Sequence, residues 1–446
     1  MWVWRFLGLI VFSTLLDFIC GRVIHEAKND SQRKLWLALS IAGNLGVLGF
    51  FKYFNFFAEN LSTLLAVAGF EAPPLVLTVL LPVGISFYTF QTMSYTIDIY
   101  QGRLEPTRGF LDFALFVSFF PQLVAGPIER ARDLLPQISA ARYFNRKQFH
   151  EGCWLMYWGL YKKVFVADNV AKIADRVYGS LDTSSGLHIL VATYAFAVQI
   201  YCDFSGYSDI ARGAAKTLGF EISLNFDIPY AARGPQEFWR RWHISLSQWL
   251  RDYLYIPLGG SRQTSSRVFL NLMFVMALGG LWHGAQWHFV FWGIYHGLLL
   301  AGYRLVGGEL GSGEMTGREM AGGESSPRAR KSIPRNAFAG LLMFHFTCLG
   351  WMLFRVESMG QMTTIGARLC GLAGDWFSAL ALGDLYLLLL YSALVITLQV
   401  FQYRSKNPLV SLGWRLPIRV TLYVAMYFSL TLGGAYDGPQ FIYFQF

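Results

Sequence analysis

Long apolar stretches separated by short basic loops recur along this chain, and this alternation restricts its fold more than any other feature. The 446 residues are 54% hydrophobic and 17% aromatic, whereas only 15% are charged. Soluble domains carry roughly 25% charged residues, so the composition is that of a membrane protein. Within lipid a segment must satisfy its own backbone hydrogen bonds, which favours helices. We therefore predict an all-α protein that crosses the bilayer several times.

The expected membrane helices follow the apolar runs, because a full span requires about 20 residues. The basic residues lie in alternate loops, which assigns those loops to the cytoplasmic side. The net charge of +9 therefore indicates topology and gives no reason to expect a nucleic-acid partner. The predicted spans are residues 6–20, 35–57, 75–97, 152–166, 186–201, 268–282, 288–303, 337–354, 375–401 and 420–432.

Three segments do not fit a simple span. Phe110–Val124 is short and has basic loops on both sides, and Pro121–Pro127 supplies helix breakers at its exit, so we predict a re-entrant segment. Residues 238–258 are amphipathic, and we expect them to lie in the interface or to re-enter the membrane. Residues 305–336 are rich in Gly and Ser and are predicted to be a flexible cytoplasmic linker within one domain, residues 1–446.

Two histidines in apolar surroundings are the leading candidates for chemistry. His243 follows an aromatic and basic run, and His283 lies between Gly280 and Gly284, a spacing that lets another helix approach closely. A titratable group at membrane depth costs several kcal/mol unless it is paired or functional. Imidazole is the usual general base near neutral pH. The structural alternatives are a histidine hydrogen-bonded between helices at 283 and an ordinary interfacial helix around 243.

Other polar groups close to these histidines in the sequence allow two interpretations. Arg240 and Arg241 suit phosphate groups of a lipid or a soluble donor, but they also suit the snorkelling arginines of an interfacial helix. Asp203, Ser205 and Asp209 follow a predicted span, where one interpretation is a polar cluster beneath the site and the other is helix capping by Ser205 and Asp209. The five cysteines are scattered without CxxC spacing, and we predict no metal site.

Taken together, the motifs resemble those of the membrane-bound O-acyltransferase family. Phe238–Ser247 and Gly280–Gly284 carry the resemblance to the family as a whole. The motifs that are similar to the bacterial alginate O-acetyltransferase-like branch are Pro121–Pro127, Cys202–Asp209, Asn225–Tyr230, Gly350–Arg355 and Phe441–Phe444. The resemblance covers nearly the whole chain. Members of the family usually carry more membrane sequence before the region that matches Trp4–Phe6, and residues 305–336 are longer here.

The resemblance implies a helical barrel of about ten to twelve membrane helices with re-entrant segments, in the inner membrane of a bacterium. It implies that His283 is the catalytic base and that His243 is its partner across a tunnel through the membrane. It also implies a donor on the cytoplasmic side, acetyl-CoA, another acyl-CoA or another acyl thioester, with no bound cofactor. The residues expected to line the tunnel or to support the site are Trp242, Trp282, Arg240, Arg241, Asp203 and Ser205.

The function predicted on this basis is O-acetyl transfer to a hydroxyl of an exported, alginate-like polysaccharide, or to a periplasmic protein that passes the acyl group on. Within the same class, D-alanyl transfer to teichoic acid and acetylation of peptidoglycan are the alternatives. A proton-coupled transporter, in which His243 and His283 relay protons, is the alternative from another class. The sequence has no internal repeat, which argues against the commoner transporter folds.

Overall fold

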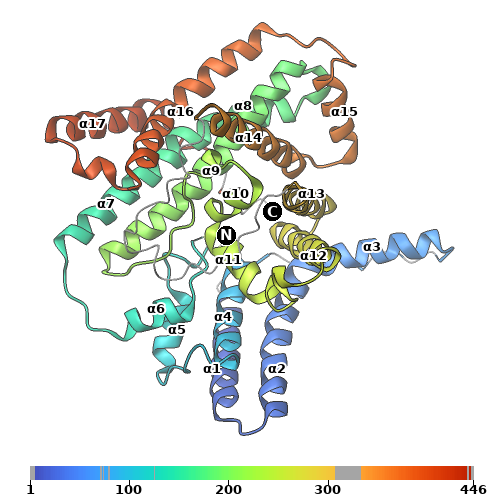
Figure 1. The fold of residues 1–446 in the computed structure, drawn as a ribbon, viewed down its shortest axis with the longest axis vertical. Coiled ribbons are helices and arrows are strands. Elements are labelled where there is room, and N and C mark those ends of the chain that lie inside the picture. Colours follow the sequence, from blue (N-terminus) through green and yellow to red (C-terminus); the bar gives the residue numbers. More distant parts are fainter. Residues whose placement is uncertain are drawn as a thin grey trace. The chain divides into compact units, whose positions relative to one another are not determined.

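The structure is a computed structural model, which describes residues 6–70, 73, 75–78, 81–124, 126–306, 333–438 and 441–442. In this part of the chain all regular elements are helices (Figure 1). The described segments long and apolar enough to cross a membrane are Leu7–Glu26, Asp30–Val67, Gly186–Thr217, Ser265–His283, Asn336–Arg355, Ala379–Ser405 and Leu416–Gly433. The prediction of an all-helical, multi-pass membrane protein is confirmed, whereas the expected ten to twelve membrane helices stay a prediction.

The chain forms two compact units. The first draws its described residues from Met1–Asn225, Trp282–Gln286 and Thr364–Phe446, and the second from Phe226–Leu281 and Trp287–Thr363. The helices of the first unit are α1 (Leu7–Glu26), α2 (Asp30–Leu48), α3 (Phe54–Val67), α4 (Ile85–Tyr100), α5 (Phe110–Ser118), α6 (Ala131–Ser139), α7 (Arg146–Leu160), α8 (Asp168–Tyr178), α9 (Gly186–Thr217), α16 (Ala379–Ser405) and α17 (Leu416–Gly433).

The second unit is smaller. Its helices are α10 (Pro235–Arg241), α11 (Ile244–Leu250), α13 (Trp287–Leu305) and α14 (Ile333–Arg355). Two helices, α12 (Ser265–His283) and α15 (Met359–Leu369), have residues in both units. Short π-helical stretches cover Gly49–Tyr53, Tyr161–Ala167 and Arg251–Tyr255, and short 3-10 turns cover Leu181–Thr183, Pro229–Ala231, Gly260–Arg262 and Val410–Gly413.

Polar side chains join the first helices of the chain. Helices α1, α2 and α4 pack against one another (Figure 1). The buried carboxylate of Asp17 on α1 accepts hydrogen bonds from Ser40 Oγ (2.5 Å) and Asn44 Nδ2 (2.7 Å) of α2. Ser40 Oγ also lies 2.8 Å from Thr96 Oγ1 on α4. Because a buried polar group is costly unless it is hydrogen-bonded, this network fixes how the three helices meet.

The helical segment predicted at residues 35–57 is longer in the structure. Helix α2, the π-helical stretch Gly49–Tyr53 and α3 form one continuous segment, Asp30–Val67, of 38 residues. At about 1.5 Å per residue it is roughly 57 Å long, well beyond a hydrocarbon core of about 30 Å. The π-helical stretch in its middle carries Lys52, and such stretches often occur at functional sites.

Helix α4 is shorter than the predicted span 75–97. The helix begins only at Ile85, because Pro82 lacks a backbone amide and Gly84 adopts a left-handed φ of +80°. A Cβ atom at Gly84 would lie 2.4 Å from the carbonyl oxygen of Leu123. The turn before α4 is therefore packed directly on the backbone of the segment that follows α5. Prediction of a helix from residue 75 was wrong.

Helix α9 is longer than the predicted span 186–201, since it runs for 32 residues to Thr217. The polar patch Cys202–Asp209 lies inside this helix, so the interpretation of Ser205 and Asp209 as helix caps was wrong. Glycines let α9 and α7 approach closely: a Cβ atom at Gly213 would lie 2.5 Å from the carbonyl oxygen of Gly152. Helix α7 also continues beyond its predicted span of 152–166. Together with the π-helical stretch Tyr161–Ala167 and α8 it forms one helical run, Arg146–Tyr178.

The structure describes part of the predicted re-entrant segment and the two edges of the predicted linker. Helix α5 ends at Ser118 after nine residues, about 14 Å, which is too short to cross a membrane. The re-entrant path of Phe110–Val124 stays a prediction. Most of the predicted linker, residues 307–332, lies outside the described part of the chain. At its edges Leu305 belongs to α13 and Ile333 begins α14. The flexible linker itself stays a prediction.

Candidate active site

His283 is the last residue of α12, and its side chain faces a small cavity. The cavity has a volume of about 90 Å³ and lies within the first unit. The end of α12 contributes Trp282 and His283, and the remaining lining comes from Lys52, the segment Leu81–Phe87 and Val124. Only 4% of His283 is exposed, so a substrate that reaches its ring is largely removed from water.

The buried ammonium of Lys52 holds the end of α12. Lys52 Nζ donates to the carbonyl oxygens of Trp282 (2.6 Å) and His283 (3.2 Å) and to Ser86 Oγ (3.3 Å). The last carbonyl groups of a helix have no partner within the helix and carry a partial negative charge, which favours a cation at this point. Lys52 therefore fixes the backbone that presents His283 to the cavity.

Lys52 is not among the residues predicted from the sequence, although the sequence contains a signal for it. Lys52 is a single lysine in the aromatic run Gly49–Phe57, and an ionisable residue inside an apolar segment is by itself a reason to suspect a functional site. Its partner carbonyls lie about 230 positions further along the chain. No sequence pattern connects positions so far apart, so the contact emerges only from the structure.

Aromatic packing fixes Trp282, and its predicted supporting role in the site stays a prediction. Its ring is edge-on to Phe87, with ring centroids 5.3 Å apart, and is stacked on Phe90 at 5.7 Å. The His283 ring lies edge-on to Trp282, with centroids 5.1 Å apart. Such aromatic pairs restrict the rotamers of the rings that form them. The orientation of His283 is therefore set both by the Lys52 contact with its backbone and by its Trp282 neighbour.

The close helix approach predicted at Gly280 is confirmed, and the neighbour is α13. A Cβ atom at Gly280 would lie 2.1 Å from the carbonyl oxygen of Phe289, and one at Gly293 would lie 2.1 Å from the carbonyl oxygen of Met276. Only glycine allows two helix backbones to come so close. Gly284, the other half of the predicted pair, follows the end of α12.

His243 lies in the second unit and has an unusual backbone. It is fully buried and adopts a left-handed φ of +43°, which is uncommon for a residue other than glycine. Its carbonyl oxygen accepts a hydrogen bond from Ser247 N (3.0 Å) at the start of α11. Backbone conformations of this kind cost of order 1–3 kcal/mol and cluster at active sites. This strain supports a functional interpretation of His243.

Trp242 is buried in an aromatic cluster of the second unit. Its ring stacks on Phe238 with centroids 5.7 Å apart and planes 13° apart, and it contacts Phe226 (5.0 Å) and Trp351 (4.8 Å). His243 belongs to the second unit and His283 to the first. The proximity of the two histidines across a tunnel stays a prediction.

The two arginines before Trp242 differ in their surroundings. Arg241 Nε donates to Glu237 Oε1 (3.0 Å), and Arg241 Nη1 donates to the carbonyl oxygen of Asp227 (3.0 Å). These contacts hold α10 against the segment before it, which is a structural role within the second unit. Arg240 is an exposed residue at the end of α10. A phosphate-binding role for either arginine stays a prediction.

Asp203 and Ser205 form a buried polar cluster with two lysines of the predicted span 152–166. Lys162 Nζ donates to Ser205 Oγ (2.9 Å) and to Asp209 Oδ2 (2.7 Å), and Lys163 Nζ lies 2.8 Å from Asp203 Oδ1. Both lysines come from the second π-helical stretch. None of these residues lines the His283 cavity, and their contacts join this stretch to α9. A supporting role of Asp203 and Ser205 in the site stays a prediction.

The chain is similar in sequence to a known protein family and to several of its members. The profile of the MBOAT, membrane-bound O-acyltransferase family, matches residues 107–307. The chain is 41% identical over 376 residues to the probable alginate O-acetylase AlgI of Azotobacter vinelandii, covering 84% of this chain and 70% of that protein. It is 34% identical over 399 residues to the peptidoglycan O-acetyltransferase of Helicobacter pylori, covering 84% and 72%.

A third relative is the probable alginate O-acetylase AlgI of Pseudomonas aeruginosa, which is 44% identical over 286 residues. That match covers 63% of this chain and 54% of the relative, so the chain spans little more than half of the Pseudomonas protein. The matched residues of the family profile include both His243 and His283. The length and level of these similarities, together with the helical membrane fold, establish that the chain belongs to the membrane-bound O-acyltransferase family.

Proposed function

We propose that this membrane acyltransferase moves an acetyl group from acetyl-CoA, or from another acyl thioester, to a hydroxyl of an exported, alginate-like polysaccharide or to a periplasmic protein that passes the group on. The observation that carries the proposal is the buried His283 beside a cavity, in a chain that is 41% identical to a probable alginate O-acetylase. The proposal places residues 1–446 in the inner membrane of a bacterium as one domain, with His243 as the second histidine of the tunnel.

The proposed reaction needs one base and one stabilised oxyanion. A ring nitrogen of neutral His283 accepts the proton of the hydroxyl as its oxygen attacks the thioester carbonyl carbon. The tetrahedral intermediate then collapses, the carbon–sulfur bond breaks, and the leaving thiolate takes the proton back from the imidazolium. The proposal assigns stabilisation of the developing oxyanion to His243, the second histidine, or to a neighbouring donor such as the Trp242 indole.

Acetylation of peptidoglycan is a second candidate, because the Helicobacter pylori relative is matched over 72% of its length. Both acceptors present sugar hydroxyls, so the chemistry at His283 is the same. The two functions differ only in the glycan that receives the acetyl group. Incubation of the purified protein with labelled acetyl-CoA and either uronate oligosaccharides or peptidoglycan fragments separates them, since the label is expected in one product.

Substitution of His283 tests the proposal. In nanodiscs the His283→Ala variant is expected to lose acceptor-dependent thiol release from acetyl-CoA by about a hundredfold or more, the range of general-base catalysis. His25→Ala, which changes an exposed histidine at the end of α1, is the control and is expected to keep the wild-type rate. A His283→Ala protein that transfers acetyl groups at the wild-type rate would show that another residue is the base.

A further inference from the structure

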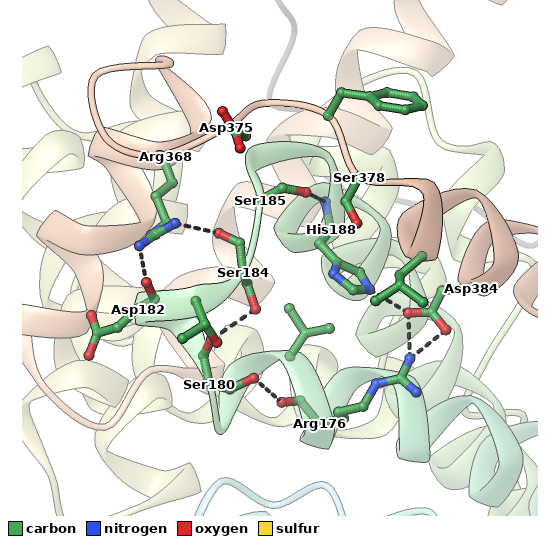
Figure 2. A pocket seen from close by; sticks show the side chains of 15 residues that line it. Arg176, Ser180, Asp182, Ser184, Ser185, His188, Arg368, Asp375, Ser378 and Asp384 are labelled. Atoms are coloured by element: carbon green, nitrogen blue, oxygen red, sulfur yellow. Dashed lines mark hydrogen bonds and ion pairs between the residues drawn. The ribbon is translucent and has the colours of Figure 1, made fainter.

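A second pocket of the first unit shares no lining residue with the His283 cavity. It has a volume of about 720 Å³, within the range of about 300–1,000 Å³ that is common for ligand-binding clefts. The pocket lies between the end of α8, the start of α9 and the start of α16 (Figure 2). Its lining is mostly polar, and none of the residues predicted to carry catalysis contributes to it.

One buried carboxylate organises the wall of this pocket. Asp384 on α16 is 5% exposed, and it accepts a hydrogen bond from His188 Nε2 of α9 at 2.6 Å and contacts the guanidinium of Arg176 on α8 (Figure 2). Because Nε2 carries the proton in this pair, Nδ1 of a neutral His188 is an acceptor. Three helices are thus joined at a point where both donor and acceptor groups are held in place.

Further groups add to this mixed hydrogen-bonding character. Arg368 donates to the carbonyl oxygens of Ser184 (2.7 Å) and Asp182, which fixes the loop before α9 (Figure 2). The side chains of Asp182 and Asp375 line the pocket and are exposed. The ring of Phe377, 59% exposed, adds an apolar surface to the same lining.

The helix ends indicate on which side of the membrane the pocket opens. Helix α9 carries Arg212 and Lys216 near its C-terminal end, and α16 ends in Arg404 just before Lys406. The positive-inside rule places both basic ends in the cytoplasm. Helices of 32 and 27 residues, about 48 Å and 40 Å, are long enough to cross the bilayer, so both begin on the opposite side. The pocket at their N-terminal ends therefore faces away from the cytoplasm.

The chemistry of the lining suits a sugar and not the thioester donor. The pocket contains two arginines and three aspartates, so it lacks the surplus positive charge that the phosphates of CoA require. Carboxylates and guanidinium groups together match hydroxyl groups, which both donate and accept hydrogen bonds. An exposed aromatic ring beside them offers a flat apolar surface to the C–H face of a pyranose ring.

We propose that this pocket, the Asp384 pocket, binds pyranose rings of the acceptor glycan on the extracytoplasmic side, through their hydroxyl groups and one apolar face. The inference rests on the proposed acyl transfer to a glycan and adds a separate binding site for that glycan. A neutral glycan and a uronate glycan present the same hydroxyl chemistry, and the test distinguishes them.

The test uses the full chain in nanodiscs and calorimetric titration with two probes, a neutral glucose tetrasaccharide and a mannuronate tetrasaccharide. Wild-type protein is expected to bind at least one of them saturably. Phe377→Ala and Asp375→Asn are expected to weaken that binding by about tenfold, because they remove a stacking surface and an acceptor. Phe70→Ala, which removes an equally exposed ring (67%) after α3, is the control and is expected to bind as wild type.

Two outcomes overturn the inference. One is that neither tetrasaccharide binds, and the other is that both pocket variants bind like wild type. Thiol release from acetyl-CoA with a small alcohol acceptor is measured on wild type and Phe70→Ala and is expected to be equal in both. If wild type itself releases no thiol with any acceptor, the proposed acyl transfer fails and binding at the pocket is judged separately, so the two failures are distinguishable.

Discussion

A lysine whose ammonium contacts two carbonyl oxygens has a different role from one that forms an ion pair on a surface. Lys52 Nζ is held between the backbone of Trp282 and His283 and the hydroxyl of Ser86, with no carboxylate among these contacts. A hydrogen bond from a charged group contributes about 1.5–3 kcal/mol, and removal of the cation leaves the helix carbonyls without a buried partner. Lys52 is therefore a positioning residue for His283.

Replacement of this ammonium by an apolar side chain of similar length tests that role. Lys52→Met is expected to lower kcat for acetyl transfer by about tenfold to a hundredfold, the equivalent of the lost charged hydrogen bonds. Lys34→Met is the matched control, since it changes an exposed lysine that pairs with Asp30 at the start of α2. Equal rates in Lys52→Met and wild type, measured by thiol release, would contradict the positioning role.

Glu129 gives a prediction for the dependence of stability on pH. It lies between α5 and α6, is 2% exposed, and accepts hydrogen bonds from Ser223 N (2.6 Å) and Ser223 Oγ (3.1 Å). Burial raises the pKa of this carboxyl to about 7, against the hydrogen bonds from Ser223 that lower it. The folded protein thus holds the proton more tightly than the unfolded chain does, so this group stabilises the fold most below pH 4 or so and loses its effect as pH rises through about 7.

Thermal unfolding of the detergent-solubilised protein between pH 5 and pH 8 tests whether its stability falls as pH rises. Wild type is expected to unfold at a temperature several degrees lower at pH 8 than at pH 5, and Glu129→Gln, which cannot ionise, is expected to lose part of that difference. Glu105→Gln is the control, because Glu105 is an exposed residue between α4 and α5. An identical pH dependence in Glu129→Gln and wild type would contradict the raised pKa.

At the scale of helices, the close contact of α12 and α13 depends on glycines. A Cβ atom at Gly293 would lie 2.1 Å from a carbonyl oxygen of α12, whereas one at Gly302, on the same helix, meets nothing within 4 Å. Gly293→Ala is therefore expected to destabilise the protein by about 1–3 kcal/mol, as overpacking does. Gly302→Ala, the control, is expected to be neutral or to stabilise by up to about 1 kcal/mol. The melting temperatures of the two variants check this, and a Gly293→Ala variant as stable as Gly302→Ala would refute the close contact.

Helix positions were easier to predict than helix ends, and the reason is physical. Apolar runs place a helix, as for α12 and α13, since burial in lipid favours any long apolar segment. Ends depend on local groups: Gly84 and Pro82 delay α4, and α9 continues through its polar patch because Lys162 and Lys163 on the neighbouring run satisfy it. Those partners lie 40 or more positions away, and no local pattern reveals them.

Some parts of the candidate site could be predicted from the sequence and others could not. Imidazoles in apolar surroundings stand out in the sequence, so His283 and His243 were predicted, and the burial of both is observed. The cavity, the contact of Lys52 with the end of α12 and the Asp384 pocket all depend on residues far apart in the chain. A sequence fixes which side chains are present, but which of them meet is decided by packing.

For the molecule in the membrane, the predicted topology gives a direct test. In a variant without native cysteines, Arg108→Cys and Arg132→Cys flank the predicted re-entrant segment at exposed positions, and Asp182→Cys lies at the Asp384 pocket. An impermeant maleimide is expected to label the first two only from the cytoplasmic side and the third only from the other side. Labelling of Arg108→Cys and Arg132→Cys from opposite sides would mean that Phe110–Val124 crosses the bilayer.

The contact between Lys52 and the end of α12 also limits how far the enzyme can be trimmed. The match to the family profile begins at residue 107, yet Lys52 and most of the wall of the His283 cavity, residues 81–87, come from before that point. A truncated protein that keeps only the profile region would retain both histidines and lose the scaffold that aims one of them. A minimal catalytic fragment must therefore include Lys52 and residues 81–87, which the family profile does not cover.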